Sequence, residues 1–585
     1  MSRGLIAERA RLSLFVVRRG ARLITGRAHA HPLLRWQFAP VMADRLLIAP
    51  QDLRTADPTR GTELAAGRLA FAGKTMVCDG LSPFALTPAS PEWAEVLTGF
   101  GWLRHLRAAD TNQARAFART AIEAWITQPA KWTDIGWRPD IVARRIISWL
   151  THAPFVLADA DPRFYRRFLR SLGRQVRYLR RTFSSLDDGL ARLRALTALT
   201  CASLCLAGQI RILNAVGRRL TAELDRQVLP DGGHISRNPR ALIDLLLDLL
   251  PLRTVFGARN VPPPDALSNA IDRMMPMLRF FRHGDGHFAN FNGMGLTPPD
   301  LLATVLAYDD ARGRPVSNAV HSGYQRLDAA GVMLMMDTGK PPPIAVSQEA
   351  HAGTLAFELS SGRHRIVVNC GLPAANRGNW RHFARGTAAH STVTVADTSS
   401  YRFVSAAPLQ RAIGAPVISG PDEVFSSREE DADGCRLWAS HDGYAGRFGI
   451  MHERTVMLAA DGRRLDGEDA LLPARGRQLS ARKPDDFAVR FHLHPSVRAT
   501  KLTHRNGVML MLANRDVWTF EGYDHEVQIE DSVYLASNEG PRRTQQIVIR
   551  GNARATPRVP WSFVQVDPAE ARKLDRSYVE PELPL

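Results

Sequence analysis

One change in hydrophobic periodicity divides this chain and limits the folds open to it. From about residue 91 to residue 308, apolar residues recur at intervals of three and four, a pattern that predicts helices. From about residue 321 almost to the C-terminus they recur at intervals of two, which predicts strands. Because a block of helices followed by a block of strands does not build an alternating α/β sheet, we expect separate helical and strand domains.

Turn signals divide the helical half and set the expected domain bounds. Asp159-Ala-Asp-Pro162 and Val261-Pro-Pro-Pro264 are typical breaks between helices. We expect helices near residues 92–107, 112–128, 139–153, 162–182, 189–214, 216–229, 239–256, 265–281 and 299–308. The predicted units are a mixed N-terminal segment (1–90), a helical domain (91–315) and a strand domain (316–585). This α+β multidomain pattern suits an incomplete (α/α) toroid followed by an antiparallel β-sandwich.

Length and composition agree with two large folded domains. A chain of 585 residues exceeds what one ordinary core organises, and 45% hydrophobic with 23% charged residues is typical of a globular protein. The formal net charge of +18 favours a polyanionic partner, such as nucleic acid, anionic lipid or acidic polysaccharide. Almost all of this charge is arginine, which biased codon usage would also produce. No nucleic-acid-binding motif is present, so charge alone supports that class of function.

The cysteines and apolar runs bear on location. Cys78, Cys201, Cys205, Cys370 and Cys435 form no C-x-x-C pair, and Cys201 and Cys205 lie in an apolar helical run that favours buried free thiols. The basic N-terminus carries only a short apolar stretch at residues 12–17 and no small-residue cleavage site, so it does not match a standard secretory signal. No run of ~20 apolar residues predicts a membrane span.

Polar side chains stand at the ends of consecutive predicted strands. Glu349 and His351 precede a strand-like run at residues 354–360, Asn369 lies in the next run, and His390 precedes a third. Adjacent strands lie only about 4.8 Å apart, so these side chains can converge. Such convergence suits a metal or an anionic substrate.

A second polar group lies in the turn Asp231-Gly-Gly-His-Ile-Ser-Arg-Asn-Pro239, just before a predicted helix. It offers His234, Arg237 and Asn238 at a helix N-terminus, where backbone N–H groups favour anions. A carboxylate bridged by Asn238 or Arg237 is one interpretation. The other is that Asn238 is an ordinary helix cap and His234 a turn histidine.

Three stretches together resemble the heparinase II/III family of polysaccharide lyases. They are the 231–239 turn, His351-Ala-Gly-Thr-Leu-Ala-Phe-Glu-Leu359 and Arg385-Gly-Thr-Ala-Ala-His-Ser-Thr-Val393, in that order. The resemblance implies a toroid joined to a β-sandwich, an active cleft between them, and β-elimination on uronate polysaccharides. It also implies an acidic polysaccharide partner and a periplasmic or cell-envelope location, whereas the lack of an export signal leaves the cytoplasm open.

The resemblance assigns roles that this chain fills incompletely. His234 and Asn238 would neutralise the uronate carboxylate, and His351, Asn369 and His390 stand where metal-containing relatives have His, Asp and His ligands. A Zn²⁺ or another divalent ion is therefore implied, with the neutral Asn369 replacing a carboxylate. The alternative is a His–Asn–His hydrogen-bond cluster that joins three strands.

The base and the acid depart from the family pattern. Glu349 stands where some relatives have a basic histidine, and it would serve as a base only with a raised pKa; otherwise it is a loop residue at the surface. The stretch from Gly284 to Gly293 lacks the tyrosine that relatives use as acid. His287 in that stretch is one substitute. The others are the tyrosines able to reach an interdomain cleft: Tyr178, Tyr308, Tyr324, Tyr401 and Tyr444.

A loop before His390 supplies the predicted substrate grip. Arginine binds carboxylate or sulfate in a two-pronged geometry, and a tryptophan offers a flat face to a sugar ring. The residues concerned are Arg377, Trp380, Arg381 and Arg385. In the alternative, the loop is solvated and its arginines pair with nearby acids.

The main hypothesis is a lyase that cleaves an acidic polysaccharide by β-elimination. The first alternative is a relative that binds acidic polysaccharide without cleaving it, because the base or acid has been lost. The second is a nucleic-acid-binding protein. The sequence defines neither the sugar, the mode of cleavage nor the oligomeric state.

Overall fold

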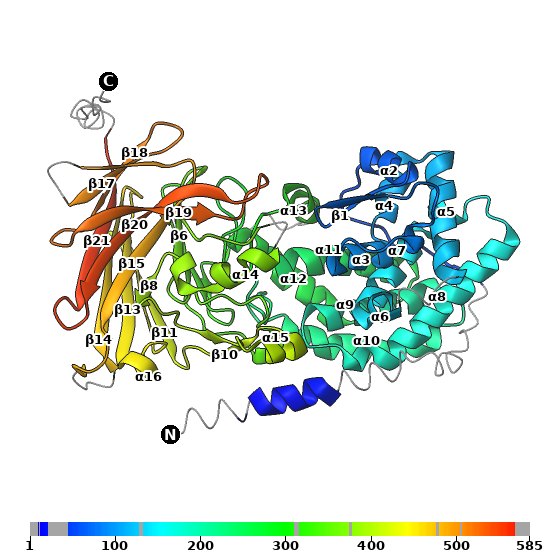
Figure 1. Ribbon diagram of the computed structural model, residues 1–585, viewed down its shortest axis with the longest axis horizontal. Coiled ribbons are helices and arrows are strands. Elements are labelled where there is room, and N and C mark those ends of the chain that lie inside the picture. Colours follow the sequence, from blue (N-terminus) through cyan, green and yellow to red (C-terminus); the bar gives the residue numbers. More distant parts are fainter. Residues whose placement is uncertain are drawn as a thin grey trace.

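The two halves of the chain form two lobes, as Figure 1 shows for the computed structural model. The model describes residues 10, 12–21, 45–127, 133–308, 315–373, 377–474, 479–502 and 506–567. Residues 45–308 form a helical lobe and residues 315–567 a strand lobe, and the two lie side by side along the long axis. The predicted order of a helical half followed by an antiparallel strand half is confirmed.

The helical lobe is a succession of helices with one small ribbon. Its helices are α2 (Pro58–Ala65), α3 (Pro91–Gly99), α4 (Leu103–Ala109), α5 (Asn112–Thr127), α6 (Thr133–Gly136), α7 (Pro139–Leu157), α8 (Pro162–Thr182), α9 (Leu190–Cys205), α10 (Ile210–Gln227), α11 (Arg240–Ala258), α12 (Asp265–Phe280) and α13 (Pro299–Leu306). The ribbon is β1 (Arg68–Phe71) paired with β2 (Lys74–Val77).

Proline and a capping side chain explain several helix starts. Both α3 and α8 begin with a proline, whose missing N–H costs nothing in the first helical turn. Ser90 accepts a hydrogen bond from the N–H of Trp93, and Asp161 accepts one from the N–H of Phe164. These caps satisfy N–H groups that the helix itself leaves free.

Two helix boundaries differ from the prediction. The segment expected at 189–214 ends at Cys205, because Leu47 donates its N–H to the Cys205 carbonyl at 2.7 Å and Leu46 pairs with Leu206. The segment expected at 92–107 is divided between α3 and α4 at Phe100, which has a left-handed φ of 57°. Both breaks arise from tertiary contacts or a single backbone turn that periodicity does not detect.

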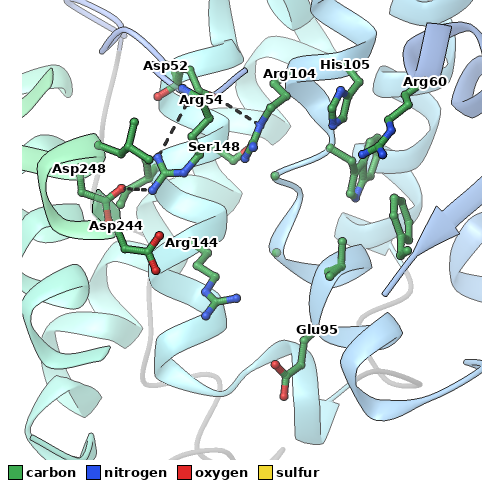
Figure 2. Close-up of a pocket in the computed structure, with 18 of the residues that line it drawn as sticks. Asp52, Arg54, Arg60, Glu95, Arg104, His105, Arg144, Ser148, Asp244 and Asp248 are labelled. Atoms are coloured by element: carbon green, nitrogen blue, oxygen red, sulfur yellow. Dashed lines mark hydrogen bonds and ion pairs between the residues drawn. The ribbon is translucent and has the colours of Figure 1, made fainter. Parts of the chain in front are cut away.

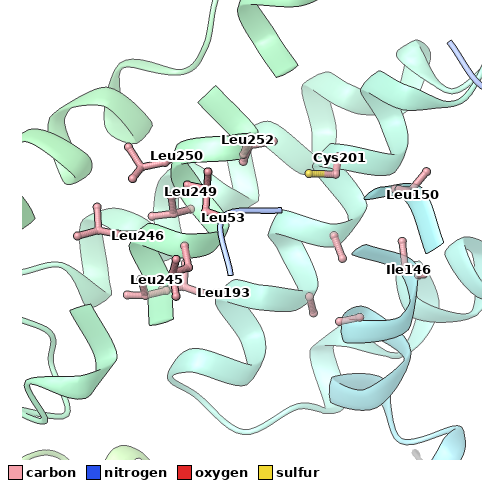
Figure 3. Packing of buried hydrophobic residues seen from close by; sticks show 14 of the residues in the cluster. Leu53, Ile146, Leu150, Leu193, Cys201, Leu245, Leu246, Leu249, Leu250 and Leu252 are labelled. Atoms are coloured by element: carbon pink, nitrogen blue, oxygen red, sulfur yellow. The ribbon is translucent and has the colours of Figure 1, made fainter. Parts of the chain in front are cut away.

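The centre of the helical lobe is a core built around α9 (Figure 3). Side chains of α7 and α11 pack against α9, with Leu150 and Leu246 both almost fully buried. Cys201 and Cys205 lie in this core as free thiols, as expected, and all five cysteines are free and buried.

The strand lobe contains two large antiparallel sheets. A nine-stranded sheet has the order β19 (Val527–Tyr534), β20 (Arg542–Asn552), β15 (Asp486–Leu493), β7 (His364–Val368), β6 (Phe357–Ser361), β5 (Val332–Asp337), β4 (Tyr324–Ala329), β3 (Asn318–Ala319), with β8 (Val393–Val395) paired to β15. An eight-stranded sheet has the order β11 (Val424–Glu430), β12 (Gly434–His441), β13 (Ile450–Ala459), β14 (Arg464–Pro473), β21 (Arg558–Gln565), β18 (Val517–Glu521), β17 (Gly507–Met511), β16 (Arg498–Lys501).

The two sheets share one apolar core. Phe357 of the first sheet stacks on Trp561 of the second with ring centroids 5.6 Å apart, and Phe491 meets the same tryptophan at 4.9 Å. Along β13, buried and partly buried residues alternate strictly, which is the period of two seen in the sequence.

Short helices interrupt the strand lobe. They are α14 (Arg377–Arg385), α15 (Ala407–Ile413) and α16 (Ala445–Phe448), and a small ribbon pairs β9 (Arg402–Phe403) with β10 (Val417–Ser419). The stretch predicted as an arginine-bearing loop is therefore the helix α14. The last helix of the helical lobe ends at Leu306 and the first strand begins at Asn318, with residues 309–314 of the predicted boundary outside the described ones. No helix in the described ranges is long and apolar enough to cross a membrane.

A buried ion pair lies between the neighbouring strands β13 and β14 of the eight-stranded sheet. Arg454 donates to both carboxylate oxygens of Asp469 at 2.8 and 2.9 Å, and its other nitrogen donates to the carbonyls of Leu355 and Ser391, each at 2.8 Å. The carboxylate also accepts from the Trp561 indole at 2.9 Å. Since Arg454 and Asp469 are both fully buried, each charge depends on the other for compensation.

We predict that Arg454→Ala lowers the free energy of unfolding by about 3–5 kcal/mol, because it leaves the Asp469 carboxylate buried without its partner. Arg464→Ala is the matched control, since Arg464 pairs with Asp466 on the surface of the same sheet. That control should cost less than about 1 kcal/mol. Urea unfolding measures both, and equal losses would show that the buried pair has no special role.

Candidate functional site

The 231–239 turn lies against the strand lobe, as the hypothesis of an interdomain site required. Asp231 accepts hydrogen bonds from the Ser322 N–H at 2.7 Å and from its hydroxyl at 3.0 Å. Arg237 extends further, donating to the carbonyls of Ser322 and Gly323 at 2.8 and 3.0 Å. The guanidinium also forms an ion pair with Asp337, at the end of β5. The two lobes therefore meet through this turn.

Arg237 is part of the structure of the junction. Only 6% of the residue is exposed, and the guanidinium lies 4.8 Å from the centre of the Tyr324 ring. Burial disfavours the charged guanidinium, but the adjacent Asp337 carboxylate outweighs this effect and raises the pKa of Arg237. Arg237 was predicted to bind substrate, and in this arrangement its donors are already used by the protein.

A chain of hydrogen bonds continues from Asp337 to the histidines. The Asn292 side-chain amide donates to Asp337 at 2.9 Å and to the Tyr324 hydroxyl at 2.7 Å. The Asn292 carbonyl oxygen accepts from the N–H of His351 at 3.2 Å. His351 Nδ1 and His390 Nε2 then lie 3.1 Å apart. The predicted approach of His351 and His390 is therefore present in the structure.

The tautomers of this histidine pair follow from its partners. His390 Nδ1 lies 2.8 Å from the carbonyl oxygen of Gly386, which only accepts, so Nδ1 carries the proton. His390 Nε2 then accepts from His351 Nδ1–H. In the described part of the chain, His351 Nε2 is buried without a hydrogen-bond partner. Burial lowers the pKa of His390 to about 4 and also lowers that of His351, so both rings are neutral near pH 7.

Asn369, the third predicted ligand, is turned to other partners. Its side-chain carbonyl oxygen accepts from the Ser391 N–H at 3.0 Å, and its amide lies 3.3 Å from Glu358. Glu358 in turn lies 2.9 Å from Nε2 of His283. Among the described residues no three His, Cys, Asp or Glu side chains are grouped to hold a metal. Asn369 thus bonds to groups other than the histidine pair, and the divalent metal stays a prediction.

His234 is enclosed within its own turn. Its Nδ1 lies 2.7 Å from the Ser236 hydroxyl and its Nε2 lies 3.1 Å from the Gln227 side-chain oxygen. Burial, with a smaller effect from Arg226, lowers the pKa of His234 to about 3. Both ring nitrogens therefore have protein partners, and the ring is neutral.

Asn238 and Glu349 meet from opposite lobes at Gly293. A Cβ on Gly293 would lie 2.9 Å from Glu349 Cβ and 3.0 Å from Asn238 Nδ2, and the glycine has a φ of +90°. Only glycine tolerates both that crowding and that backbone conformation. Asn238 also accepts from the N–H of Arg240 at 2.9 Å, but the cap residue of α11 is Pro239, so Asn238 is not the helix cap of the second interpretation. Its amide nitrogen lies toward Gly293.

Glu349 is the open member of this group. Its side chain is 43% exposed and lies 3.3 Å from the Arg381 guanidinium, which also donates to the Gln348 carbonyl at 2.6 Å. Three predicted site residues, Asn238, Glu349 and Arg381, thus lie in one neighbourhood between the lobes.

The other predicted substrate-binding residues lie elsewhere or have structural contacts. Arg385 is buried and donates to the carbonyls of Ala350, Ala415 and Ser347 at 2.8, 2.6 and 3.1 Å. Burial, aided by Arg381, lowers its pKa to about 10. Trp380 packs beside a small apolar cluster, so its ring serves packing. The Arg377 side chain lies outside the described residues.

Two of the candidate tyrosines adjoin the junction. The Tyr324 hydroxyl donates to the Arg237 carbonyl at 2.6 Å, and the Tyr401 hydroxyl lies 2.9 Å from that of Thr354. Burial raises the pKa of both hydroxyls. Tyr178, Tyr308 and Tyr444 bond to Trp137, Gln51 and Val393 respectively, and His287 pairs with Asp285 at 3.4 Å.

Sequence reasoning missed Asp337, Asn292 and Glu358, which organise the junction. Asp337 directly follows the apolar run 332–336, and an acidic residue at the end of such a run is a sequence signal of a polar group at a strand end. The structure shows that Asp337 is buried. Asn292 lies in the stretch searched only for a tyrosine. Glu358 was noted only as part of a family motif.

Comparisons with known proteins give two kinds of match. The family model described as Heparinase II/III-like, C-terminal, matches residues 311–562. FtsZ-localized protein C of Caulobacter vibrioides (strain NA1000 / CB15N) is 32% identical over 540 residues, which cover 91% of this chain and 92% of that protein. This match extends through both lobes.

Solved structures of lyases share the fold at lower identity. Heparinase III superposes with a TM-score of 0.67 at 14% identity, covering 91% of this chain and 88% of that one. A mutant of heparan sulfate lyase HepC from Pedobacter heparinus superposes with a TM-score of 0.61 at 15% identity, covering 94% of this chain and 89% of that one.

The buried histidine pair predicts a loss of stability in mild acid. The pKa of His390 is about 4 in the folded chain, against about 6.5 for an unfolded histidine. Below pH ~6.5 the unfolded chain binds a proton that the folded chain does not, so this residue costs up to about 3 kcal/mol as the pH falls to ~4.

Replacing His390 by Gln should therefore flatten the fall in unfolding free energy between pH ~6.5 and ~4 by that amount, whatever its effect at pH 7. The control is His382→Gln, since His382 is exposed on α14. Denaturant titrations at a series of pH values provide the comparison. Parallel pH profiles for the wild type and His390→Gln would contradict the assignment of a buried neutral pair.

Proposed function

The chain belongs to the heparinase II/III family, and we propose that it localises with FtsZ, as its relative's name says of that protein, without cleaving polysaccharide. The incomplete (α/α) toroid and β-sandwich predicted for the family are part of this proposal. On this view the lyase scaffold is retained, and the meeting place of its lobes serves as a structural junction.

The observation that carries the proposal is the enclosure of the groups that β-elimination would use. The reaction needs a donor for the uronate carboxylate, a base for the adjacent carbon acid and an acid for the leaving oxygen. His234 has both ring nitrogens bonded within its turn. His351 and His390 bond to each other, and Tyr324 is buried with a raised pKa. A partly exposed glutamate beside an arginine, which is what remains at Glu349, is a weak base for a carbon acid.

The relative supports the second part of the proposal. FtsZ-localized protein C is 32% identical along 91% of this chain, whereas the structures of heparinase III and HepC described above are 14% and 15% identical. Because that relative's match covers both lobes, its association with FtsZ is a reasonable model for the whole chain.

We predict that a fluorescent fusion of the full chain co-localises with FtsZ in the bacterium that produces it, and that the purified protein co-sediments with FtsZ polymers. Heparinase III, which shares the fold, is the control and should stay in the supernatant. A diffuse fusion together with no co-sedimentation would sink this part of the proposal.

A uronate lyase is the second candidate, and one observation favours it. Asn238 and Glu349 come from different lobes and meet at Gly293, with Arg381 beside them. In that arrangement the Asn238 amide and Arg381 would hold the substrate carboxylate. Glu349 would take the proton from the carbon next to this carboxylate, and a carbon–carbon double bond would form as the bond to the glycosidic oxygen breaks. Water would protonate the departing oxygen, which leaves an unsaturated uronate.

Absorbance of the unsaturated product separates the two candidates. With a panel of uronate polymers, we expect no increase for the wild type above that for Glu349→Gln. Heparinase III on heparan sulfate is the positive control. If product accumulates and Glu349→Gln slows it by about 100-fold or more, as loss of a general base would, the lyase is the correct function.

A further inference from the structure

The helical lobe contains a cavity of about 470 Å³ that is separate from the lobe junction (Figure 2). All residues that line it lie between Pro50 and Pro251, so the strand lobe contributes none. The walls come from the segment before α2, from β1, α3 and α4, and from α7, α9 and α11. The volume suits a small molecule rather than a single ion.

Charged side chains dominate the walls. Six arginines and five carboxylates line the cavity. Two of the carboxylates hold several cations each. Asp248 accepts from Arg54 at 2.6 Å and from Arg194 at 3.2 Å, and Asp52 lies 3.5 Å from Arg104. This part of the wall is therefore neutralised by the protein itself.

Arg144 differs from these arginines. Within the part of the chain that the structure describes, no hydrogen bond or ion pair engages its guanidinium, and the residue is exposed to solvent inside the cavity. Figure 2 shows it between Asp244 and Glu95. Those two acids have partners of their own, since Asp244 pairs with Arg240 at 3.2 Å and Glu95 with Arg138 at 2.5 Å. Arg144 is thus a cation in the cavity that no described side chain pairs with.

The surroundings suit a hydroxylated ring next to that cation. Asp244 and Glu95 keep carboxylate lone pairs that accept from hydroxyl groups, because each is bonded on one side only. Val96 exposes 37% of its surface and lines the same cavity, as do Leu64 and Ile147. Apolar patches of this kind cover the C–H face of a sugar.

We propose that this cavity binds a small hydroxylated ring that carries an oxyanion, as in a sugar acid or a sugar phosphate. Arg144 would hold the oxyanion through two parallel N–H donors, and Asp244 and Glu95 would accept from ring hydroxyls. The proposal stands apart from the question of FtsZ association or β-elimination, since binding is measured without either.

The cavity and the lobe junction share one helix. Asn238 lies two residues before α11, and Asp244 lies four residues after its first residue, a rise of about 6 Å at 1.5 Å per residue. A ligand at Asp244 therefore contacts the same helix whose N-terminal turn anchors the strand lobe.

Calorimetric titration of the full-length protein tests the proposal with glucuronate, glucose 6-phosphate, glucose and inorganic phosphate. We expect saturable one-site binding of glucuronate or glucose 6-phosphate, whichever oxyanion fits, at least about tenfold tighter than glucose or phosphate. Arg144→Gln should weaken this binding by about tenfold or more, and Arg144→Lys by less, because lysine keeps the charge but not the paired donors.

Arg170→Gln is the matched control, because Arg170 is an exposed arginine on α8 away from the cavity, and it should bind as the wild type does. Asp244→Asn should reduce the preference for the charged sugar over inorganic phosphate. Unchanged melting temperatures verify that the variants fold. The proposal is overturned if neither charged sugar binds, if phosphate binds as tightly as they do, or if Arg144→Gln binds like the control.

Discussion

The junction of the two lobes depends on the ion pair between Arg237 and Asp337. A buried guanidinium needs compensation for all of its donors, and here a carboxylate and three backbone carbonyls supply it. The same carboxylate orients Asn292, which in turn holds the backbone of His351. The position of the histidine pair therefore follows from a contact that belongs to the interface between lobes.

This dependence explains why most polar groups of the junction bond to other protein groups. Burial keeps these histidines neutral, and their hydrogen bonds to each other or to carbonyls make the junction rigid. These bonds leave few ring nitrogens free to bind a ligand. Catalytic groups in a lyase need the opposite, namely a lone pair or proton that remains available to substrate. His351 Nε2 keeps a lone pair, yet it is buried, and the partly exposed Glu349 lies beside Gly293. The polar network thus stabilises the contact between the lobes, and it leaves few groups available to a substrate.

Much of the fold and the family membership followed from the sequence, because both depend on patterns along the chain. Periodicity located α5 and α8 almost to the residue, and the three ordered stretches pointed to the right family. The end of α9 did not follow, because its stop depends on pairing with Leu46 and Leu47, more than a hundred residues earlier. The helix α14 did not follow either: Trp380, Phe383 and Ala384 have helical spacing, but the glycine and the arginines around them favour a loop in the sequence.

The site residues could be predicted from the sequence only where two side chains stand at the ends of strands in the same sheet and so lie close together. His351 and His390 were expected to meet because each stands beside a strand of the same sheet, and they do. The partner of Asn369 depended on the register of β6 against β7, which contains an irregularity at Leu359, so the opposing Glu358 was not foreseen. Asp337 was missed for a related reason, since its partner comes from the other lobe.

The contrast between Arg237 and Arg144 shows how one residue type takes two roles in this chain. Arg237 reaches across an interface where carbonyls and a carboxylate are fixed by the fold, so its charge is satisfied on folding and strengthens the contact. Arg144 lies where the nearby acids Glu95 and Asp244 pair with other arginines, so among the described residues its guanidinium has no ion-pair partner. An arginine paired with a carboxylate, as Arg237 is, adds nothing to the net charge of +18, so this charge comes from the excess of basic over acidic residues. The positive charge of this family member therefore indicates function at the positions where the protein has left it uncompensated.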